Sequence, residues 1–225
     1  MLNTRHFAFG SALAALLLAG SLHADAAPKS AANPAIAAGV PAATYSLDKA
    51  HASLIFEVSH MGFSNWTGRF ANWDAKLTLD PKNPAKSHVE ATIDPNSLSA
   101  DHPPKGFLEE LRGTQFLNAV QFPKMTFKST KVTMTGPNTA DVTGDFGMHG
   151  MTKPVTLHVT FNGGWASMKL DPGGARAGFS ADGSLNRSDF GIANGLPAKG
   201  TTMGVGDLVT FHIEAEFSQH PPVEK

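Results

Sequence analysis

The chain has 225 residues, a net formal charge of −1 and no cysteine. Its charged residues are scattered, so no basic face marks a nucleic-acid partner and no polybasic segment marks an anionic membrane surface. The lack of cysteine excludes disulfides, thiol catalysis and cysteine-ligated metals, so the core alone must hold the fold together.

Residues 1–26 have the features of a secretory signal peptide. Arg5 supplies the positive n-region, residues 7–19 supply the apolar h-region, and residues 24–26 form an A-x-A cleavage signal. The apolar stretch is shorter than the roughly 20 residues that span a membrane. Ser21 stands where a bacterial lipoprotein would carry its acylated cysteine. We therefore expect a protein that is exported, cleaved and released without an acyl anchor.

The rest of the chain divides into three parts by composition. Residues 27–43 are rich in alanine and proline and lack any hydrophobic pattern, which is typical of a disordered tether. Residues 44–218 suit one domain, because all-β barrels often run to about 200 residues in a single unit. We expect residues 219–225 to form a disordered tail.

Short runs of alternating apolar and polar residues fill the chain from Tyr45 to Phe217. Alternation with a period of two predicts half-buried antiparallel strands, and many such strands in series form a sandwich or a barrel. The apolar rows lie within residues His51–His60, Trp66–Asp80, Val89–Ile93, Met125–Met134, Val142–Met148, Val155–Phe161, Ala175–Leu185 and Val209–Phe217. We expect the rows on either side of residues 149–154 to form a hairpin.

The alternation changes phase within the second row. Gly68 and Phe70 share one parity, whereas Trp73 and Leu77 share the other. One strand can keep both pairs inside only if a bulge near Asn72 resets the alternation. Bulges of this kind bend long strands where a sheet curls into a barrel.

One segment, between Asp101 and Gly113, predicts a short amphipathic helix. Asp101 can cap its start, residues 103–104 are prolines that suit the first turn, and Gly113 suits the C-terminal stop. Its apolar residues Phe107, Leu108 and Leu111 fall on one face. Such a helix among strands would cover a sheet face or plug one end of a barrel. The glycine-rich segment 192–206 is the other irregular element.

The content of the interior decides what such a fold can do. An eight-stranded barrel is just wide enough to be filled by side chains or to hold one small ligand. The inward rows mix bulky residues with small ones, namely Ala75, Ala91, Gly144, Ala177, Ala181 and Ala215. Aligned small residues would leave an apolar channel, whereas interleaved phenylalanines would make the barrel solid. Both arrangements fit the pattern.

The histidines do not form a metal-binding pattern. His51 and His60 are nine residues apart, an odd spacing, so they point to opposite faces of a regular strand. A zinc site needs three or four converging ligands, and only His60 shares the buried parity. Met148, His149 and Met151 form a cluster of soft ligands that suits copper(I), although Met148 also continues an apolar row and fits the core. We expect no metal site.

Catalytic signatures are absent, with no G-x-S-x-G, H-E-x-x-H or phosphate-binding glycine loop. The best polar cluster is Arg187–Gly191, at a strand end before the glycine-rich segment. Its simpler interpretation is an ion pair followed by a glycine turn. Its functional interpretation is a polar rim at the mouth of a pocket.

A series of short segments spans nearly the whole predicted domain in a fixed order. They are Tyr45–Asp48 with His51, Ile55–Gly62, Gly68–Phe70, Asp94–Ser99, Glu110–Arg112 with Phe116, Phe122–Pro123, Phe127–Thr130, Gly144–Pro154, Arg187–Gly191 and Gly206–Val209. Together they resemble the YceI family of exported lipid- and polyisoprenoid-binding proteins. Departures fall on the helix and its exit, with Leu108 and Glu110 in place of an acidic and a histidine residue, and Phe122 in place of a tyrosine. Head-group preference is therefore the property that transfers least.

The resemblance implies an all-β fold, an eight-stranded antiparallel lipocalin-like barrel with one short covering helix, which holds an isoprenoid or similar long-chain lipid without catalysis. From the inward rows and the helix, we expect the lipid tail to contact Leu54, Phe56, Val58, Phe70, Leu77, Val89, Ile93, Phe107, Leu111, Phe127, Phe146, Leu157, Ala177, Phe179, Ala181, Phe190 and Phe211. At the head-group end we expect His60, Arg112, Arg187 and Asp189.

The resemblance also implies a bacterial periplasmic carrier with no cofactor other than its bound lipid. Some relatives accompany cytochrome b561-type membrane proteins, which suggests such a partner and an isoprenoid quinone as ligand. Two alternatives stay open at this point. One is a barrel hydrolase or isomerase that uses His60 or the Arg187–Asp189 cluster, and the other is a solid barrel that binds a protein partner. The sequence also leaves open whether the protein is a monomer or a dimer.

Overall fold

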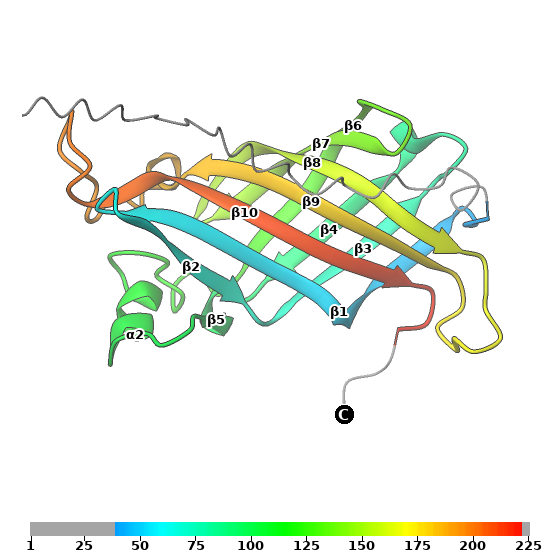
Figure 1. Cartoon of the computed structure of the whole chain (residues 1–225), viewed down its shortest axis with the longest axis horizontal. Coiled ribbons are helices and arrows are strands. Elements are labelled where there is room, and N and C mark those ends of the chain that lie inside the picture. Colours follow the sequence, from blue (N-terminus) through cyan, green and yellow to red (C-terminus); the bar gives the residue numbers. More distant parts are fainter. Residues whose placement is uncertain (1–38, 222–225) are drawn as a thin grey trace, which may run out of the picture.

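The computed structural model describes residues 39–221, which form one antiparallel sheet rolled into a closed ring. The hydrogen-bonded order is β10-β9-β8-β7-β6-β4-β3-β1, and β10 pairs again with β1, which confirms the expected eight-stranded barrel (Figure 1). The strands of the ring are β1 (Ala43–His60), β3 (Trp73–Leu79), β4 (His88–Ile93), β6 (Met125–Met134), β7 (Thr139–Met148), β8 (Met151–Trp165), β9 (Arg176–Asn186) and β10 (Val205–Ser218). Two shorter strands, β2 (Ser64–Phe70) and β5 (Leu98–Ser99), extend the sheet beside β1.

The long strand β1 joins the ring to this extension. It pairs with β10 on one side, while on the other side its first residues pair with β3 and its last residues, from Ile55 onward, pair with β2. Its register with β10 shifts between Leu47 and Ala52. Irregularities of this kind bend a strand and turn the corner of a barrel.

The phase change expected near Asn72 occurs at the junction of two strands. β2 ends at Phe70 and β3 begins at Trp73, so the exposed pair Ala71 and Asn72 lies between them. Gly68 and Trp73 have opposite parity and both are buried. The predicted reset is therefore confirmed, as a break between two strands.

The predicted covering helix is present as α2 (Phe107–Arg112), but it begins later than expected. Its N-cap is Gly106, with φ of 79°, and Asp101 instead lies 3.7 Å from the guanidinium of Arg69. Proline disfavours helical geometry in the residue before it, so the prolines at 103–104 disfavour a helix at residues 102 and 103. The left-handed backbone of Gly106 then places the first helical residue at Phe107. The C-terminal stop at Gly113 is confirmed.

The predicted hairpin is formed by β7 and β8, with a shorter turn than expected. Met148 pairs directly with Met151, so the turn consists of His149 and Gly150 alone. Their φ angles of 53° and 77° are both positive, as a two-residue type I′ turn requires. Lys153 and Pro154, which the sequence placed in the turn, already belong to β8.

The antiparallel order gathers the connections at two ends of the barrel. The α2 end holds the β1–β2 turn, the segment 100–124 with α2, the β7–β8 turn and residues 187–204 (Figure 1). The far end holds the β3–β4, β6–β7 and β8–β9 connections and the start of β1. Within residues 39–221, no helix has the length and hydropathy of a membrane span.

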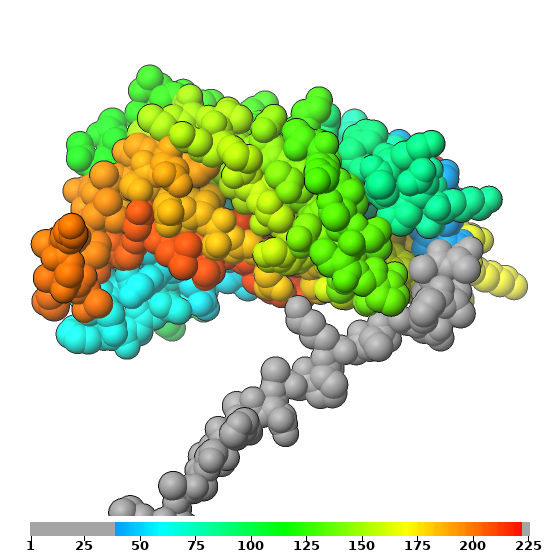
Figure 2. All heavy atoms as spheres, turned by 90° about the horizontal axis from the view of Figure 1, so that it is seen from above, coloured from blue at the N-terminus to red at the C-terminus, as the bar shows by residue number. Residues whose placement is uncertain are grey.

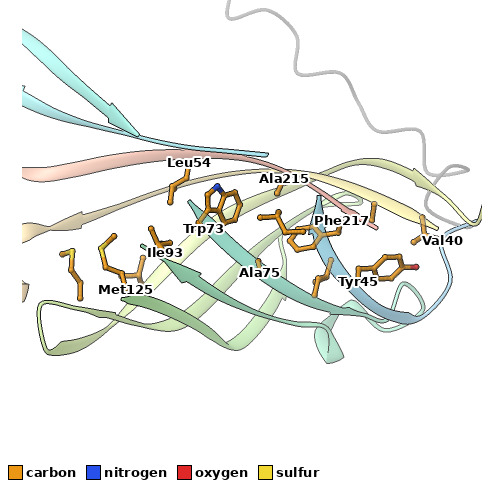
Figure 3. Packing of buried hydrophobic residues seen from close by; sticks show 14 of the residues in the cluster. Val40, Tyr45, Leu54, Trp73, Ala75, Ile93, Met125, Ala215 and Phe217 are labelled. Atoms are coloured by element: carbon orange, nitrogen blue, oxygen red, sulfur yellow. The ribbon is translucent and has the colours of Figure 1, made fainter. Parts of the chain in front are cut away.

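One side of the far end is tightly packed. Val40 and Tyr45 lie there, and Tyr45 is fully buried, with its hydroxyl donating to the carbonyl oxygen of Pro41 at 2.7 Å (Figure 3). The expected tether therefore extends too far, because its last residues pack against the barrel. The rest of the tether and the expected signal peptide lie outside the described residues.

The C-terminal boundary also shifts outward. The backbone N–H groups of Gln219 and His220 donate to the carbonyl oxygens of Ala175 and Gly173, at 3.1 and 3.0 Å. These bonds place the first residues of the expected disordered tail in the fold, while 222–225 lie outside the described range. Hydrogen-bonded backbone of this kind has no hydrophobic signal, so alternation alone could not detect it.

Candidate ligand-binding cavity

A cavity of about 770 Å³ occupies the barrel interior. At the α2 end it is lined by Trp66, Phe107 and Ile192, and at the far end by Met134 and Asn138. The volume lies within the range of about 300–1,000 Å³ that is typical of small-molecule sites. The interior is therefore hollow, which decides between the channel and the solid barrel that the sequence left open.

The cavity is long and narrow. A 14-residue strand such as β10 spans about 45 Å at about 3.3 Å per residue, and a tilt of roughly 40° reduces this to about 35 Å along the barrel axis. Dividing the volume by this height gives a mean cross-section of about 20 Å², which suits one hydrocarbon chain with neighbours about 4 Å away. The cavity thus fits one extended tail better than a compact ligand.

Nearly all of the wall is apolar, because each strand turns its apolar parity inward. Figure 3 shows Leu54, Trp73, Ile93 and Met125 along the interior. The polar residues that line the cavity are His60, Ser64, Asn65 and Arg187 at the α2 end and Ser87, His88, Asn138 and Thr139 at the far end. Polar groups are thus confined to the two ends.

Inward-facing glycines keep the aromatic rings against the wall. Phe211 pairs with Gly183 across β10 and β9, and a Cβ at Gly183 would lie 2.5 Å from the ring. Phe56 covers Gly68 in the same way, at 2.6 Å from where a Cβ would be. A ring that occupies the space above a glycine lies flat on the neighbouring strand. The lumen stays open although several phenylalanines face it.

Most of the predicted tail residues line this cavity. They are Leu54, Phe56, Val58, Phe70, Leu77, Val89, Ile93, Phe107, Leu111, Phe127, Phe146, Leu157, Phe179, Ala181 and Phe211. Sequence reasoning missed Phe116, Leu117 and Ile192, which also line it. These three lie outside the strands, where parity gives no direction. Trp73 and Ala215 were recognised as inward-facing but not assigned to the ligand.

Two predicted tail residues lie outside the cavity. Ala177 is fully buried in β9, where it faces Gly164 of β8, and a Cβ at Gly164 would meet Val40 at 2.7 Å. The chain before β1 therefore fills the space that Ala177 was expected to line. Phe190 is buried behind the wall, with its ring 5.6 Å from that of Phe146 in an edge-to-face contact.

Two of the predicted head-group residues also lie elsewhere. Arg112 donates to the carbonyl oxygen of Leu98 at 2.5 Å, which ties α2 to β5, and it does not line the cavity. Asp189 is exposed on the 3-10 turn (Arg187–Phe190) that follows β9, and it does not line the cavity. His60 does line the cavity, at the end of β1.

Arg187 is in the cavity wall but is only 6% exposed. Its guanidinium donates to four backbone carbonyl oxygens, those of Ile192, Asn194, Val205 and Gly206, at 2.8–3.0 Å. These bonds hold both ends of the loop 192–204 together. The ion pair expected between Arg187 and Asp189 is replaced by these carbonyl contacts.

The negative charge near Arg187 does not fully compensate its buried guanidinium. Burial lowers the pKa of its guanidinium, and the nearby Asp207 only partly opposes this. The carboxylate of Asp207 accepts hydrogen bonds from the N–H and the hydroxyl of Ser188, at 2.9 and 2.7 Å. Guanidinium has five N–H donors, and among the described residues four of them have acceptors. The fifth N–H has no acceptor among those residues.

A cluster of charged side chains at the far end ties the strands together. Arg176 on β9 bonds to Asp48 and Glu216 at 2.7 Å and to Asp171 at 2.9 Å. Burial acts to raise the pKa of Asp48, but the hydrogen bonds from Arg176 and His51 outweigh it and hold that pKa below its usual value. Because the guanidinium already engages these carboxylates, the cluster acts as an ion-pair network.

The copper(I) alternative gains no support from the geometry. Met148 is buried in the cavity wall, whereas Met151 is exposed. Nδ1 of His149 lies 2.9 Å from the carbonyl oxygen of Phe190, a contact in which the ring nitrogen donates. The thioether of Met148 is therefore explained as part of the wall, and the imidazole as a support for the neighbouring turn.

Known proteins share both the sequence and the fold. Residues 45–217 match the YceI-like domain. The chain is 40% identical over 158 residues to Protein YceI of Salmonella arizonae, which covers 69% of this chain and 79% of that protein. It is 39% identical over 163 residues to a UPF0312 protein of Pseudomonas savastanoi, and this match covers 71% of this chain and 82% of that protein.

Solved structures share the barrel. BcnA of Burkholderia cenocepacia superposes with a TM-score of 0.64 at 24% identity, over 76% of this chain and 98% of that one. A polyisoprenoid binding domain from Saccharophagus degradans superposes with a TM-score of 0.54 at 16% identity, over 77% of this chain and 97% of that one. At such identities the likeness shows the fold alone. From the domain match and the curated relatives, the chain belongs to the YceI family.

Proposed function

We propose that this protein is a carrier for an isoprenoid or another long-chain lipid, whose tail lies inside the barrel. The observation that carries the proposal is the apolar cavity of about 770 Å³, which reaches both ends of the barrel. The domain from Saccharophagus degradans, which shares the fold, is described as polyisoprenoid binding. A single narrow lumen with polar groups only at its ends suits a tail with a small head.

The energetics favour a carrier that also releases its ligand. Burying hydrocarbon gains about 0.8 kcal/mol per methylene relative to water, which for a long tail would exceed the ceiling of about 18–21 kcal/mol for non-covalent binding. Such lipids, however, already reside in a bilayer. Moving the tail from bilayer to barrel exchanges one apolar environment for another, so the net gain is small and exchange remains reversible.

The head group is proposed to lie at the α2 end. Arg187, His60, Ser64 and Asn65 line the cavity there, and one N–H of Arg187 has no acceptor among the described residues. A buried donor of this kind gains from an oxygen acceptor, such as a hydroxyl, a quinone carbonyl or a phosphate. Arg187 therefore selects lipids whose head presents an acceptor oxygen.

The expected leader and the family resemblance support a proposal for the cellular setting. We propose export through cleavage of residues 1–26 and action in the periplasm, where a carrier could pass an isoprenoid quinone to a cytochrome b561-type membrane protein. No cofactor, metal or catalytic step is required, because binding and release alone move the lipid.

Uptake of a long-chain polyprenol tests the proposal. Ala181 lines the cavity from β9, so Ala181→Phe places a ring across a lumen that is wide enough for one chain. We expect this variant to take up solanesol at least about tenfold more weakly than wild type, because overpacking costs about 1–3 kcal/mol. The measurement is titration of the purified protein with solanesol, monitored by tryptophan fluorescence.

Ser184→Phe is the matched control, because Ser184 lies three residues further along β9 on its exposed outer face. It adds the same ring without entering the lumen and should bind solanesol like wild type. Equal uptake by all three proteins would contradict the assignment of the cavity to the tail. No uptake by wild type would contradict the proposed function.

A further inference from the structure

Large apolar side chains are exposed on the loops of the α2 end. Phe63, in the β1–β2 turn, is 83% exposed, and Met203, in the loop 192–204, is 64% exposed. Val120, on the segment between α2 and β6, is 94% exposed. Isolated exposed residues of this kind are common, but a group of them on one surface marks an interaction site.

The β1–β2 turn, which carries Phe63, and the loop 192–204, which carries Met203, contact each other. The N–H of Met61 donates to the carbonyl oxygen of Gly204 at 2.8 Å. Thr202 lies directly over Gly62, where an added Cβ would come within 2.8 Å of its side chain. Figures 1 and 2 show the two segments side by side at the same end of the barrel. The two apolar side chains therefore belong to one surface.

This surface surrounds the end of the cavity. Ser64 and Trp66, which follow Phe63, line the cavity, and so do Ile192 and Val205 at the two ends of the loop. The exposed apolar residues thus continue the apolar wall outward. A tail that enters or leaves here passes over them instead of through open water.

The charges of these loops favour an anionic surface. In the segments that carry the exposed apolar residues, 61–66, 113–124 and 192–204, the charged residues are Lys124 and Lys199. The neighbouring segment 101–112 has charges of both signs, namely Asp101, Lys105, Glu109, Glu110 and Arg112. Lysines next to a bilayer are attracted by anionic lipids. Two lysines do not make a polybasic segment, so the apolar side chains must provide most of the attraction.

The far end also exposes apolar residues. Leu170, in the β8–β9 connection, is 90% exposed, and Met168 is partly exposed beside it. The same connection carries Asp171, which belongs to the network with Asp48 and Glu216. Arg176 already engages the carboxylates of this network, and Lys169 lies between Met168 and Leu170. The far end therefore provides a control pair of exposed apolar residues at the opposite end of the barrel.

We propose that the α2 end docks on the surface of a lipid bilayer. Phe63 and Met203 insert between lipids, while Lys124 and Lys199 face the anionic head groups. The inference rests on the proposed function, because docking matters for a carrier whose tail must cross from bilayer to barrel. It adds the partner, a membrane surface, and the end of the molecule that meets it.

Vesicle flotation with the full mature protein tests docking. The vesicles contain phosphatidylcholine with about one quarter phosphatidylglycerol, a proportion that gives a negative surface potential. The double variant Phe63→Ser with Met203→Ser should bind at least about tenfold more weakly than wild type, since two large apolar side chains no longer leave water. The control pair Met168→Ser with Leu170→Ser should bind like wild type.

A second measurement separates docking from lipid binding. The same proteins are loaded with solanesol, and the amount retained is measured by extraction along with the rate of transfer to acceptor vesicles. The docking variant should retain the lipid but transfer it at least about tenfold more slowly, because its apolar contact with the bilayer is lost. Normal retention with no vesicle binding by wild type would overturn docking and leave the carrier function intact.

Other outcomes test docking and the carrier function separately. Vesicle binding that is equal in wild type and the docking variant, or lost equally in the control pair, shows that another surface is responsible. If the free protein sediments as a dimer and Phe63→Ser dissociates it, the surface is an interface between two copies. Vesicle binding without any retained solanesol would contradict the carrier function while supporting docking.

Discussion

Arg187 shows how a charged side chain can be buried without a carboxylate. Four carbonyl oxygens accept its hydrogen bonds, and they come from both ends of the loop 192–204. Hydrogen bonds to a charged group are worth about 1.5–3 kcal/mol each, and losing a partner leaves buried carbonyls unsatisfied. The residue therefore holds the rim of the cavity in place before any ligand arrives.

Replacing Arg187 with lysine tests this role. Lysine has three donors without the planar fork, so it cannot reach all four carbonyls, and we expect the free energy of unfolding to fall by about 2–4 kcal/mol. Denaturant unfolding of the ligand-free protein measures the change. Arg69→Lys is the control, because Arg69 is exposed and its ion pair with Asp101 is a surface contact worth at most about 1 kcal/mol. Equal stability of Arg187→Lys and wild type would refute the role.

The ion pair between Asp48 and Arg176 makes stability depend on pH in the acid range. The native pKa of Asp48 is lowered, so its contribution is present above the usual carboxyl value of about 3.9 and is lost as pH falls through the native pKa. Asp48→Asn should therefore be less stable than wild type at neutral pH, with the difference shrinking below about pH 4. Unfolding free energies measured across pH check this.

The control for this titration is Asp145→Asn, at an exposed position of β7. At this exposed position the substitution should change the free energy of unfolding by less than about 0.5 kcal/mol. If the Asp48→Asn difference from wild type stayed constant with pH, the buried pair would not be the source of the acid dependence.

Sequence reasoning worked unevenly for single residues. Arg187 was correctly expected in the cavity wall, because polar residues at a strand end suggest a rim. Its carbonyl partners could not be foreseen, since they lie on a loop whose path has no periodic signal. The prediction that Arg112 and Asp189 lie at the head-group end was wrong for the same reason. Their segments are helical or turn-like, so parity does not apply to them.

At the scale of strands, the pairing of aromatic residues with glycines keeps the lumen open. The alternation predicted which residues face inward, and the cavity wall matches it along β1, β4, β6 and β10. Alternation does not say which residues are neighbours across strands. The contact of Phe211 with Gly183 depends on register, so the open channel could not be derived from the pattern alone.

Gly183→Ala tests this arrangement. Its Cβ would lie 2.5 Å from the ring of Phe211, so the ring must swing into the lumen. We expect solanesol affinity to fall about three- to tenfold, while the free energy of unfolding changes by less than about 1 kcal/mol because alanine is otherwise favoured in strands over glycine. Solanesol titration and denaturant unfolding, run in parallel, measure the two effects.

Gly178→Ala is the matched control on the same strand. There the nearest atom to the new Cβ is a backbone oxygen at 3.8 Å, so the same methyl group fits without moving a ring. It should leave solanesol affinity unchanged. Loss of affinity in both variants, or in neither, would show that the position of the Phe211 ring does not control the lumen.

At the scale of the whole molecule, the barrel separates two tasks. The far end is closed on one side by Val40 and Tyr45 and strengthened by the Arg176 network, whereas the α2 end combines a short helix, a pinned loop and exposed apolar residues. The ion-pair network thus lies at the opposite end from the one where we propose that lipid enters. The barrel and its strand count were predicted from the alternation and the family resemblance together.

The lipid that remains bound during purification tests the account most directly. The protein is expressed with its leader in a bacterium, purified without detergent, extracted with organic solvent and analysed by mass spectrometry. We expect about one long-chain isoprenoid lipid per wild-type barrel, because the cavity has room for one chain, and little lipid in Ala181→Phe. Wild-type protein that yields no lipid, or the same amount of lipid as Ala181→Phe, would contradict the account.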